Sequence, residues 1–197
     1  HPDKPAPKCT PTPGKLKRIF TRGHRLEVNM ADWMRLAGFD LVTTKADGYP
    51  YGFITGNGQI RGHVDGIIRG FAIKNPEALG PTECDPHIWE NKVVGGKGWR
   101  GVEKHGVLKH YPKYDAQAQM YMAYMDMPAC LFTFLNADTC EIYVELVTFD
   151  PARAQAASDR AVVIVTATRA GELLPKAASS GDVYPCSLCR FKDECWG

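Results

Sequence analysis

Three charged residues near the middle of the chain have the types and the spacing that suit binding of a divalent cation. Asp65 lies in a strand-like run, and Glu90 and Lys92 lie two positions apart in a later run. Because alternate residues of a strand point to the same face, Glu90 and Lys92 should project together. Carboxylate oxygens suit Mg²⁺ or Mn²⁺, and a lysine beside them can position or deprotonate a water molecule.

A cation held by such a group would activate water and offset the charge that develops on a phosphate during hydrolysis. Two carboxylates placed together without a cation would require one of them to stay protonated. Taken alone, however, Glu-x-Lys is also typical of a solvated cross-strand pair, and Asp-Gly of a turn. The three residues therefore need their context before they indicate a function.

The elements that must position these residues follow from the hydrophobic periodicity in the first half of the chain. Apolar residues at three- and four-residue spacing predict a helix over 16–37, with Gly38 at its C-cap. Gly56-Asn57-Gly58 predicts a tight turn between two strands. Short apolar runs between turn residues predict strands at 39–44, 51–55, 60–68 and 87–94.

The second half continues the alternation of helices and strands. Residues 95–113 are rich in glycine and basic side chains and predict a loop, which is followed by a helix over 114–125. Residues 131–134 and 141–149 predict a hairpin. Asp150 as N-cap and Pro151 at the first position predict a helix to about 169, although 162–165 also suits a strand. This order predicts a mixed α/β or α+β domain.

Length and composition suit one domain with a small appendage. The chain has 197 residues, of which 44% are hydrophobic, and a net charge of +2 that neither requires nor excludes a nucleic-acid partner. We expect an extended lead-in over 1–15, a core over 16–175 and a cysteine-containing tail over 176–197 that packs on the core. The segment after Gly171 is predicted to be a loop. No apolar run approaches the roughly 20 residues of a membrane span, and no secretory signal is visible. The first residue is His1 rather than Met, which is consistent with a missing upstream segment.

Seven cysteines form an odd set, which argues against complete disulfide pairing and indicates a reducing, cytoplasmic compartment. Cys186, Cys189 and Cys195 have the spacing of ligands for zinc or for an iron–sulfur cluster, but either site needs a fourth ligand. The spacing alone does not choose between the two.

The neighbours of the charged residues add an ordered pattern. His24 follows a glycine in the first helix, Asp65 precedes a glycine, Glu90 and Lys92 follow on the next strand, and Gln117 and Tyr121 lie on the helix after it. In this order, residues 16–197 resemble the PD-(D/E)XK nucleases. The resemblance is to their RecB-like branch, with the lambda-type and CRISPR-associated RecB-like exonucleases, and is greatest to small phage-encoded members.

The resemblance implies that residues 16–175 form a restriction-endonuclease-like nuclease core, in which helices flank a central mixed β-sheet, followed by a C-terminal cysteine cluster. It implies a Mg²⁺- or Mn²⁺-dependent deoxyribonuclease, an exonuclease rather than an endonuclease, that acts in phage recombination, repair or CRISPR-type DNA processing. DNA is the expected partner, with a homo-oligomer or a recombination or CRISPR protein beside it. The alternatives are a non-catalytic DNA-binding or assembly subunit and an iron–sulfur sensor protein.

By the same resemblance, the metal ligands would be His24, Asp65, Glu90 and the backbone carbonyl of Asn91. Glu27, one turn after His24, would face the same site. His24 alone would otherwise be a histidine on a helix surface.

Three further residues receive catalytic roles from the resemblance. Lys92 would act on the attacking water, Gln117 would orient that lysine or a DNA phosphate, and Tyr121 would support Gln117. For Gln117 and Tyr121, ordinary packing of an amphipathic helix is the alternative.

The resemblance also implies a [4Fe–4S] cluster on Cys186, Cys189 and Cys195, with a fourth cysteine before the first helix. Cys9 is the candidate for this position, and zinc remains the alternative occupant. Cys84, Cys130 and Cys140 are expected to be ordinary buried or loop cysteines.

Basic side chains gather between Lys92 and Gln117, with aromatic residues among them. Cations can contact phosphates and aromatic rings can stack on unpaired bases, so this segment suits DNA binding, but it equally suits a solvated loop. The residues are Lys97, Arg100, Lys104, His105, Lys109, His110 and Lys113, with Trp99, Tyr111 and Tyr114. Four of them are the predicted DNA contacts: Lys97, Arg100, Lys104 and Lys109.

Overall fold

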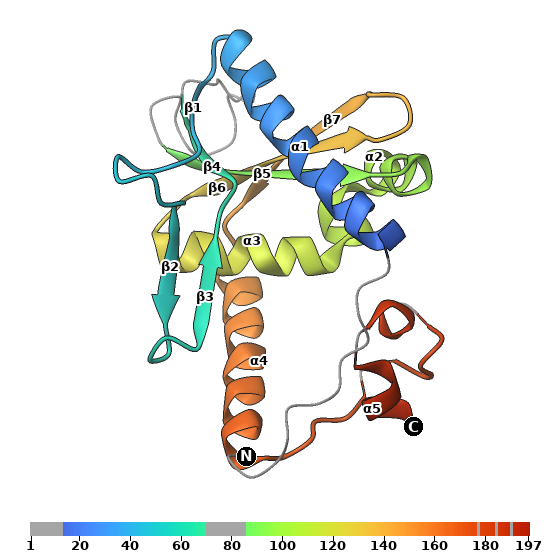
Figure 1. Ribbon diagram of the computed structural model, residues 1–197. Coiled ribbons are helices and arrows are strands. Elements are labelled where there is room, and N and C mark those ends of the chain that lie inside the picture. Colours follow the sequence, from blue (N-terminus) through green and yellow to red (C-terminus); the bar gives the residue numbers. More distant parts are fainter. Residues whose placement is uncertain (1–13, 70–85, 177, 184, 190) are drawn as a thin grey trace. The chain divides into compact units, whose positions relative to one another are not determined.

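A computed structural model of the chain shows a central β-sheet flanked by helices (Figure 1). The residues that the structure describes are 14–69, 86–176, 178–183, 185–189 and 191–197.

The central sheet has five strands in the order β1-β4-β5-β6-β7. Neighbouring strands are antiparallel except for β5 and β6, which are parallel, so the sheet is mixed as predicted. The strands are β1 (Asp40–Val42), β4 (Gly66–Arg69), β5 (His87–Val94), β6 (Ala129–Asn136) and β7 (Ile142–Thr148).

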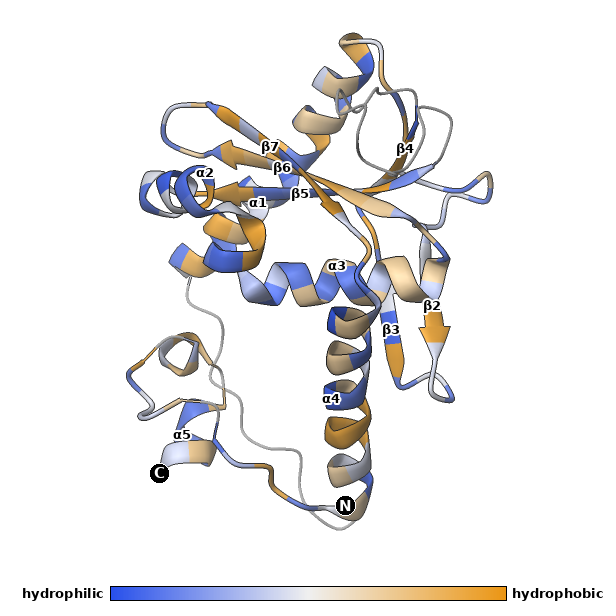
Figure 2. Cartoon of the chain, turned by 180° about the vertical axis from the view of Figure 1, so that it is seen from behind, coloured by the Kyte–Doolittle hydropathy of each residue, from blue (hydrophilic) through white to orange (hydrophobic). Residues whose placement is uncertain are grey.

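Each face of the sheet packs against a different set of helices. Trp89 belongs to the core beneath α1 (Gly14–Leu36), and its neighbour Ile88 to the core beneath α2 (Gly96–His110) and α3 (Pro112–Met125). This alternation is the two-residue period of a strand that is buried on both faces. β6 is buried along its whole length and is predominantly hydrophobic in Figure 2.

A separate hairpin of β2 (Gly52–Thr55) and β3 (Ile60–His63) precedes the central sheet. Its turn is Gly56-Asn57-Gly58, as predicted, and all three residues have positive φ, which glycine and asparagine tolerate. The prediction of one strand over 60–68 was wrong, because the chain bends at Val64 and Asp65, between β3 and β4. The apolar pattern continues across the bend, so periodicity alone did not reveal it.

The prediction of a loop over 95–113 was also wrong, since most of this segment forms α2. Trp99, Val102 and Val107 are buried at helical spacing. The helix is interrupted at Gly106, whose φ of 73° and ψ of 170° are not helical. The many glycines had suggested a loop, but three buried apolar side chains stabilise the helix more than its glycines destabilise it.

The helix predicted after Asp150 is confirmed as α4 (Pro151–Ala170), and it includes 162–165, for which a strand had been the alternative. Oδ1 of Asp150 accepts hydrogen bonds from the backbone N–H groups of Ala152 and Arg153, at 2.9 and 3.1 Å, as an N-cap should. The tail, predicted as a loop, contains the short helices η1 (Cys186–Leu188) and α5 (Lys192–Trp196).

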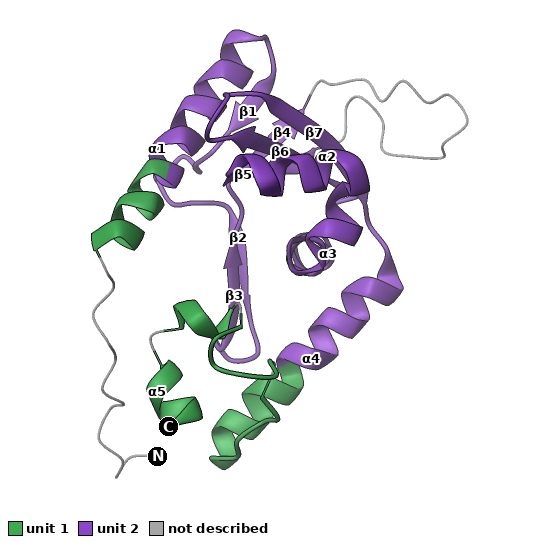
Figure 3. Ribbon diagram, turned by 90° about the vertical axis from the view of Figure 1, so that its right-hand side faces the viewer, with its two compact units in different colours: residues 1–22, 162–197 green, residues 23–161 purple. Residues whose placement is uncertain are grey.

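The chain divides into two compact units (Figure 3). One contains residues 23–161, with all five strands of the sheet, the hairpin, α2 and α3. The other contains residues 1–22 and 162–197, including the tail cysteines. Among the helices in the described ranges, none combines the length and the apolar character needed to cross a membrane.

Candidate active site

Asp65 lies at the bend that connects the hairpin to the central sheet. β4 pairs with only the first half of β5, where Gly66 lies opposite Trp89. Just beyond that point, Oδ2 of Asp65 accepts a hydrogen bond from the backbone N–H of Asn91, at 2.8 Å. The bend therefore brings the Asp65 carboxylate to the part of β5 that carries Glu90 and Lys92.

Glu90 and Lys92 lie on the same face of β5, as the strand alternation predicted. Nζ of Lys92 lies 2.5 Å from Oε2 of Glu90 and 3.8 Å from Oδ2 of Asp65. Glu90 is 1% exposed, because β5 lies between β4 and β6 and Glu90 is opposite Phe132 of β6. Two carboxylates and one ammonium group thus form a compact and mostly buried cluster.

The negative charge of this cluster is not fully compensated. Oε1 of Glu90 is buried and has no hydrogen-bond partner among the described residues. Burial raises the pKa of Glu90 to about 7, although Lys92 acts in the opposite direction. Burial by itself lowers the pKa of Lys92, but the Glu90 and Asp65 carboxylates outweigh it and raise this pKa above its ordinary value. A cation beside Glu90 would satisfy the remaining oxygen.

Gln117 and Tyr121 lie one turn apart on α3 and contact each other. Nε2 of Gln117 donates a hydrogen bond to the Tyr121 hydroxyl, at 2.6 Å. The Tyr121 ring lies against Gly62 of β3 so closely that a Cβ at position 62 would overlap it. Burial raises the pKa of Tyr121 against the effect of this hydrogen bond, and the Glu90 carboxylate adds to the increase. The Gln117–Tyr121 pair therefore lies within electrostatic range of the charged cluster.

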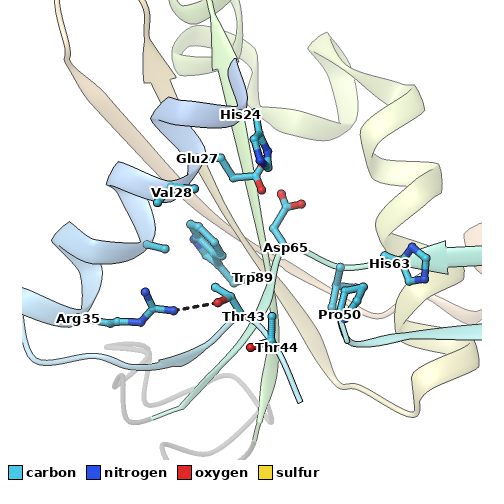
Figure 4. Close-up of a pocket in the computed structure, with 12 residues that line it drawn as sticks. His24, Glu27, Val28, Arg35, Thr43, Thr44, Pro50, His63, Asp65 and Trp89 are labelled. Atoms are coloured by element: carbon cyan, nitrogen blue, oxygen red, sulfur yellow. Dashed lines mark hydrogen bonds between the residues drawn. The ribbon is translucent and has the colours of Figure 1, made fainter. Parts of the chain in front are cut away.

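A cavity of about 420 Å³ opens beside Asp65. Figure 4 shows His24 and Glu27 extending from α1 towards Asp65, with Trp89 below them in this view and His63 at one side. Burial raises the pKa of Glu27, and the nearby Asp65 carboxylate raises it further, whereas His24 lowers it. His24 and Glu27 thus share this cavity with Asp65.

The structure does not assemble a complete set of metal ligands from side chains alone. No group of three or more His, Cys, Asp or Glu side chains within the described ranges is arranged to hold a metal ion. Mg²⁺, however, is commonly bound by one or two carboxylates together with waters and substrate phosphates. Asp65 and Glu90, with the uncompensated oxygen of Glu90, fit that requirement. His24 faces the cavity but does not complete a three-side-chain group.

Several supporting residues were not identified as site residues from the sequence. The Lys92 ammonium lies 5.3 Å from the centre of the Tyr114 ring, a cation–π contact. Oδ1 of Asn91 accepts a hydrogen bond from Oγ1 of Thr133, at 2.9 Å, which fixes the side chain next to the proposed carbonyl ligand. In the sequence, Tyr114 is one aromatic residue among basic ones, and no local pattern distinguishes Thr133. The Lys92–Tyr114 and Asn91–Thr133 contacts both depend on the fold, so the sequence pattern does not reveal them.

The basic residues predicted for DNA binding lie on α2 rather than on a loop. All four side chains are exposed, and none forms an ion pair with a carboxylate in the part of the chain that the structure describes. The opposite face of α2 contributes Trp99 and Val102 to the core. The four residues are Lys97, Arg100, Lys104 and Lys109.

The tail cysteines lie on or beside the two short helices of the smaller unit. Cys186 is partly exposed, Cys189 and Cys195 are exposed, and none of the three forms a disulfide with another described cysteine. They do not form a metal-binding group with the other described residues. Cys9 and Cys84 lie outside the described residues, so the [4Fe–4S] or zinc site stays a prediction. Of the cysteines expected to be ordinary, Cys130 is buried and Cys140 is exposed.

The mixed five-stranded sheet with its flanking helices is a restriction-endonuclease-like fold. The structure is similar to that of LHK-Exo from Laribacter hongkongensis in complex with dAMP. The TM-score is 0.53 and the identity 17%, over 77% of this chain and 68% of that chain.

A second structure of LHK-Exo, described as an alkaline exonuclease, has a TM-score of 0.48 and 15% identity, over 77% of this chain and 69% of that chain. The structure of SSO0001 has a TM-score of 0.49 and 15% identity, over 87% of this chain and 68% of that chain. No protein-family model and no curated protein matches the sequence. At these identities the similarity concerns the fold.

Proposed function

We propose that this protein is a metal-dependent deoxyribonuclease that hydrolyses DNA phosphodiester bonds, and that it acts as an exonuclease. The observation that carries the proposal is the buried Glu90 carboxylate with Asp65 beside it. One Glu90 oxygen contacts Lys92, and the other has no hydrogen-bond partner among the residues that the structure describes. The similarity of the fold to that of LHK-Exo supports the proposal. The settings of phage recombination, repair or CRISPR-type processing stay predictions from the sequence.

In this proposal, Asp65, Glu90 and the Asn91 carbonyl would hold Mg²⁺ or Mn²⁺, with His24 of α1 as a further ligand. When bound, the ion would supply an activated water and charge compensation for the phosphate. The backbone N–H of Asn91 donates a hydrogen bond of 2.8 Å to the Asp65 carboxylate and so holds it beside β5. Glu27 adds negative charge to the cavity and so favours a cation there.

Lys92 acts on the water that attacks the phosphorus. Its contacts with Glu90 and the Tyr114 ring hold the ammonium in place, and both carboxylates favour its protonated form. Lys92 is therefore best suited to orient the water by a hydrogen bond and to stabilise charge on the phosphate. Gln117, held by Tyr121, is the neighbouring polar group that can orient Lys92 or a phosphate oxygen.

The exposed basic residues of α2 would contact the DNA backbone. A helix places these cations on a rigid element, and they have no carboxylate partners in the described part of the chain that would compete with phosphates. The proposed set is the one predicted from the sequence: Lys97, Arg100, Lys104 and Lys109.

The test is digestion of end-labelled single- and double-stranded DNA with Mg²⁺ or Mn²⁺, by the wild type and by Lys92→Ala. Loss of a positioned cation that orients the water and stabilises charge in the transition state should slow cleavage by about 10²–10³-fold. Lys45→Ala is the matched control, because Lys45 is exposed in a turn before the hairpin and should have no effect. Equal residual activity in the wild type and Lys92→Ala would sink the proposal. DNA binding without cleavage would then indicate the non-catalytic subunit.

A further inference from the structure

The β2–β3 hairpin has two faces with different roles. In its register, Phe53 pairs with Gly62, Ile54 with Arg61, and Gly52 with His63. Phe53 and Gly62 lie on one face, and the alternate residues lie on the other.

The Phe53 face is anchored to α3. The Phe53 ring stacks on Tyr124, with 4.7 Å between ring centroids, and meets Tyr121 edge-on, at 5.9 Å. Gly62 allows the Tyr121 ring to approach the backbone. Since Tyr121 also contacts Gln117, this face is attached to the helix that lines the candidate active site. The hairpin is therefore held in place beside that site.

The opposite face is exposed and has a basic character. Ile54 is 71% exposed, and Arg61 and His63 are exposed beside it. The segment 48–64 contains no aspartate or glutamate. Arg61 forms no ion pair with any described carboxylate, whereas the exposed Arg69 of β4 lies 3.8 Å from Asp40. An unpaired guanidinium on a segment without carboxylates is complementary to an anionic partner.

This face continues from the active-site cavity. His63 lines the cavity together with Asp65. Arg61 follows His63 on the same face of β3, one two-residue step of roughly 7 Å further from the cavity. A linear polyanion with one phosphate at Asp65 would therefore meet the His63 imidazole and then the Arg61 guanidinium along β3.

We propose that the Arg61–His63 face of the hairpin binds the phosphodiester backbone of the DNA that enters the active site, with Arg61 contacting a phosphate. This proposal rests on the proposed function. Single-stranded and duplex DNA both carry the phosphodiester backbone that this face would recognise. An unpaired strand can extend along β3, and a duplex can receive a two-stranded ribbon in its major groove.

The experiment measures binding of fluorescently labelled oligonucleotides, single-stranded and duplex in separate arms, by anisotropy over a series of salt concentrations. EDTA is present so that no cleavage occurs. Removing one phosphate contact by Arg61→Ala should weaken binding and reduce the slope of log K against log salt by about one. Arg61→Lys keeps the charge and should restore most of the slope. An effect in only one arm shows which form of DNA lies on the hairpin.

Arg160→Ala is the matched control, because Arg160 is exposed on α4 and likewise lacks an ion pair with a described carboxylate. Since Arg61 and Arg160 are both exposed, neither variant should change the thermal midpoint. The hairpin proposal is overturned if Arg61→Ala binds as the wild type does in both arms, or if Arg160→Ala loses as much. If the wild type cleaves DNA but Arg61→Ala has the same salt slope as the wild type, only the hairpin proposal is refuted. A wild type that neither binds nor cleaves refutes both proposals.

Discussion

Two motifs with equally suggestive spacing in the sequence are placed very differently in the structure. Glu90 and Lys92 lie on a strand that pairs on both sides and packs on both faces. Cys186 and Cys195 lie on helices of three and five residues. Side chains on central strands have a defined geometry because the core beneath them fixes the backbone. Cysteines on short helices lack such a core, and their spacing in the sequence does not by itself define their geometry.

The difference extends to the chemistry of the two motifs. One oxygen of Glu90 is buried and has no hydrogen-bond partner within the described ranges. This creates a need for a cation, since a carboxylate away from water is costly unless it is compensated. The exposed thiols of Cys189 and Cys195 create no such need, because water solvates them. The charged cluster therefore indicates a ligand by its environment, and the cysteines indicate one only by their spacing.

Asp65→Asn should produce the largest effect and test whether the charged cluster is the functional region. Asn can still accept the hydrogen bond from Asn91, so the fold should be retained. Removing a residue that only hydrogen-bonds to a metal ligand typically lowers metal affinity or activity by about 10–100-fold. Loss of a ligand carboxylate itself should therefore reduce DNA cleavage by at least about 100-fold. Asp138→Asn is the control, because Asp138 also accepts a backbone N–H, from Gly96 at 2.8 Å. Equal cleavage by the two variants would contradict the assignment.

Gly62→Ala should show that the helix carrying Gln117 is fixed by packing on the hairpin. The new methyl group would overlap the Tyr121 ring, and such overpacking typically costs about 1–3 kcal/mol. Gly23→Ala in α1 has open space around its Cβ and should instead stabilise the protein, by roughly 0.5–1 kcal/mol. Urea denaturation measures both changes. If the two variants changed the free energy of unfolding in the same direction, the close packing of Tyr121 on Gly62 would be contradicted.

The pH dependence of stability should report the buried carboxylate in the absence of metal. The pKa of Glu90 is raised from 4.5 to about 7 in the folded protein, so the folded state binds the proton more tightly than the unfolded state. The free energy of unfolding should therefore fall as the pH rises from 4.5 to 7 and level off above, with a slope below about 1.4 kcal/mol per pH unit.

Urea denaturation in EDTA at several pH values, compared with Glu90→Gln, measures this contribution. The variant lacks the titrating group and should lose that part of the slope. Parallel curves for the wild type and Glu90→Gln would show that Glu90 is not the group responsible.

The smallest effect on cleavage is expected when Cys186, Cys189 and Cys195 are replaced together by serine. If the tail holds the predicted [4Fe–4S] cluster, protein purified without oxygen should contain iron and sulfide, and the triple variant should lose both. Zinc in place of iron would support the alternative occupant. Cys140→Ser, another exposed cysteine, is the control. If the triple variant cleaved DNA as poorly as Asp65→Asn, the tail cysteines would matter as much for cleavage as the charged cluster. The contrast between the two regions would then be lost.

Features that depend on neighbours in the sequence were predictable. Glu90 and Lys92 share a face because strand alternation is local, and Asp150 caps α4 because its side chain bonds to the N–H groups that follow it. α2 was missed for a physical reason, since its stability comes from the burial of Trp99 and Val102 against the sheet and not from helix propensity.

The sequence by itself determined which residue types are available for the proposed chemistry, their order, and the common direction of Glu90 and Lys92, because each of these follows from local geometry. Only the tertiary structure decided that Asp65 meets β5 at Asn91 and that Tyr121 packs on Gly62. Only the fold, likewise, left one oxygen of Glu90 buried without a partner among the described residues. These contacts join segments far apart in the chain. They form because the burial of a shared core offsets the conformational entropy that is lost when such segments are brought together.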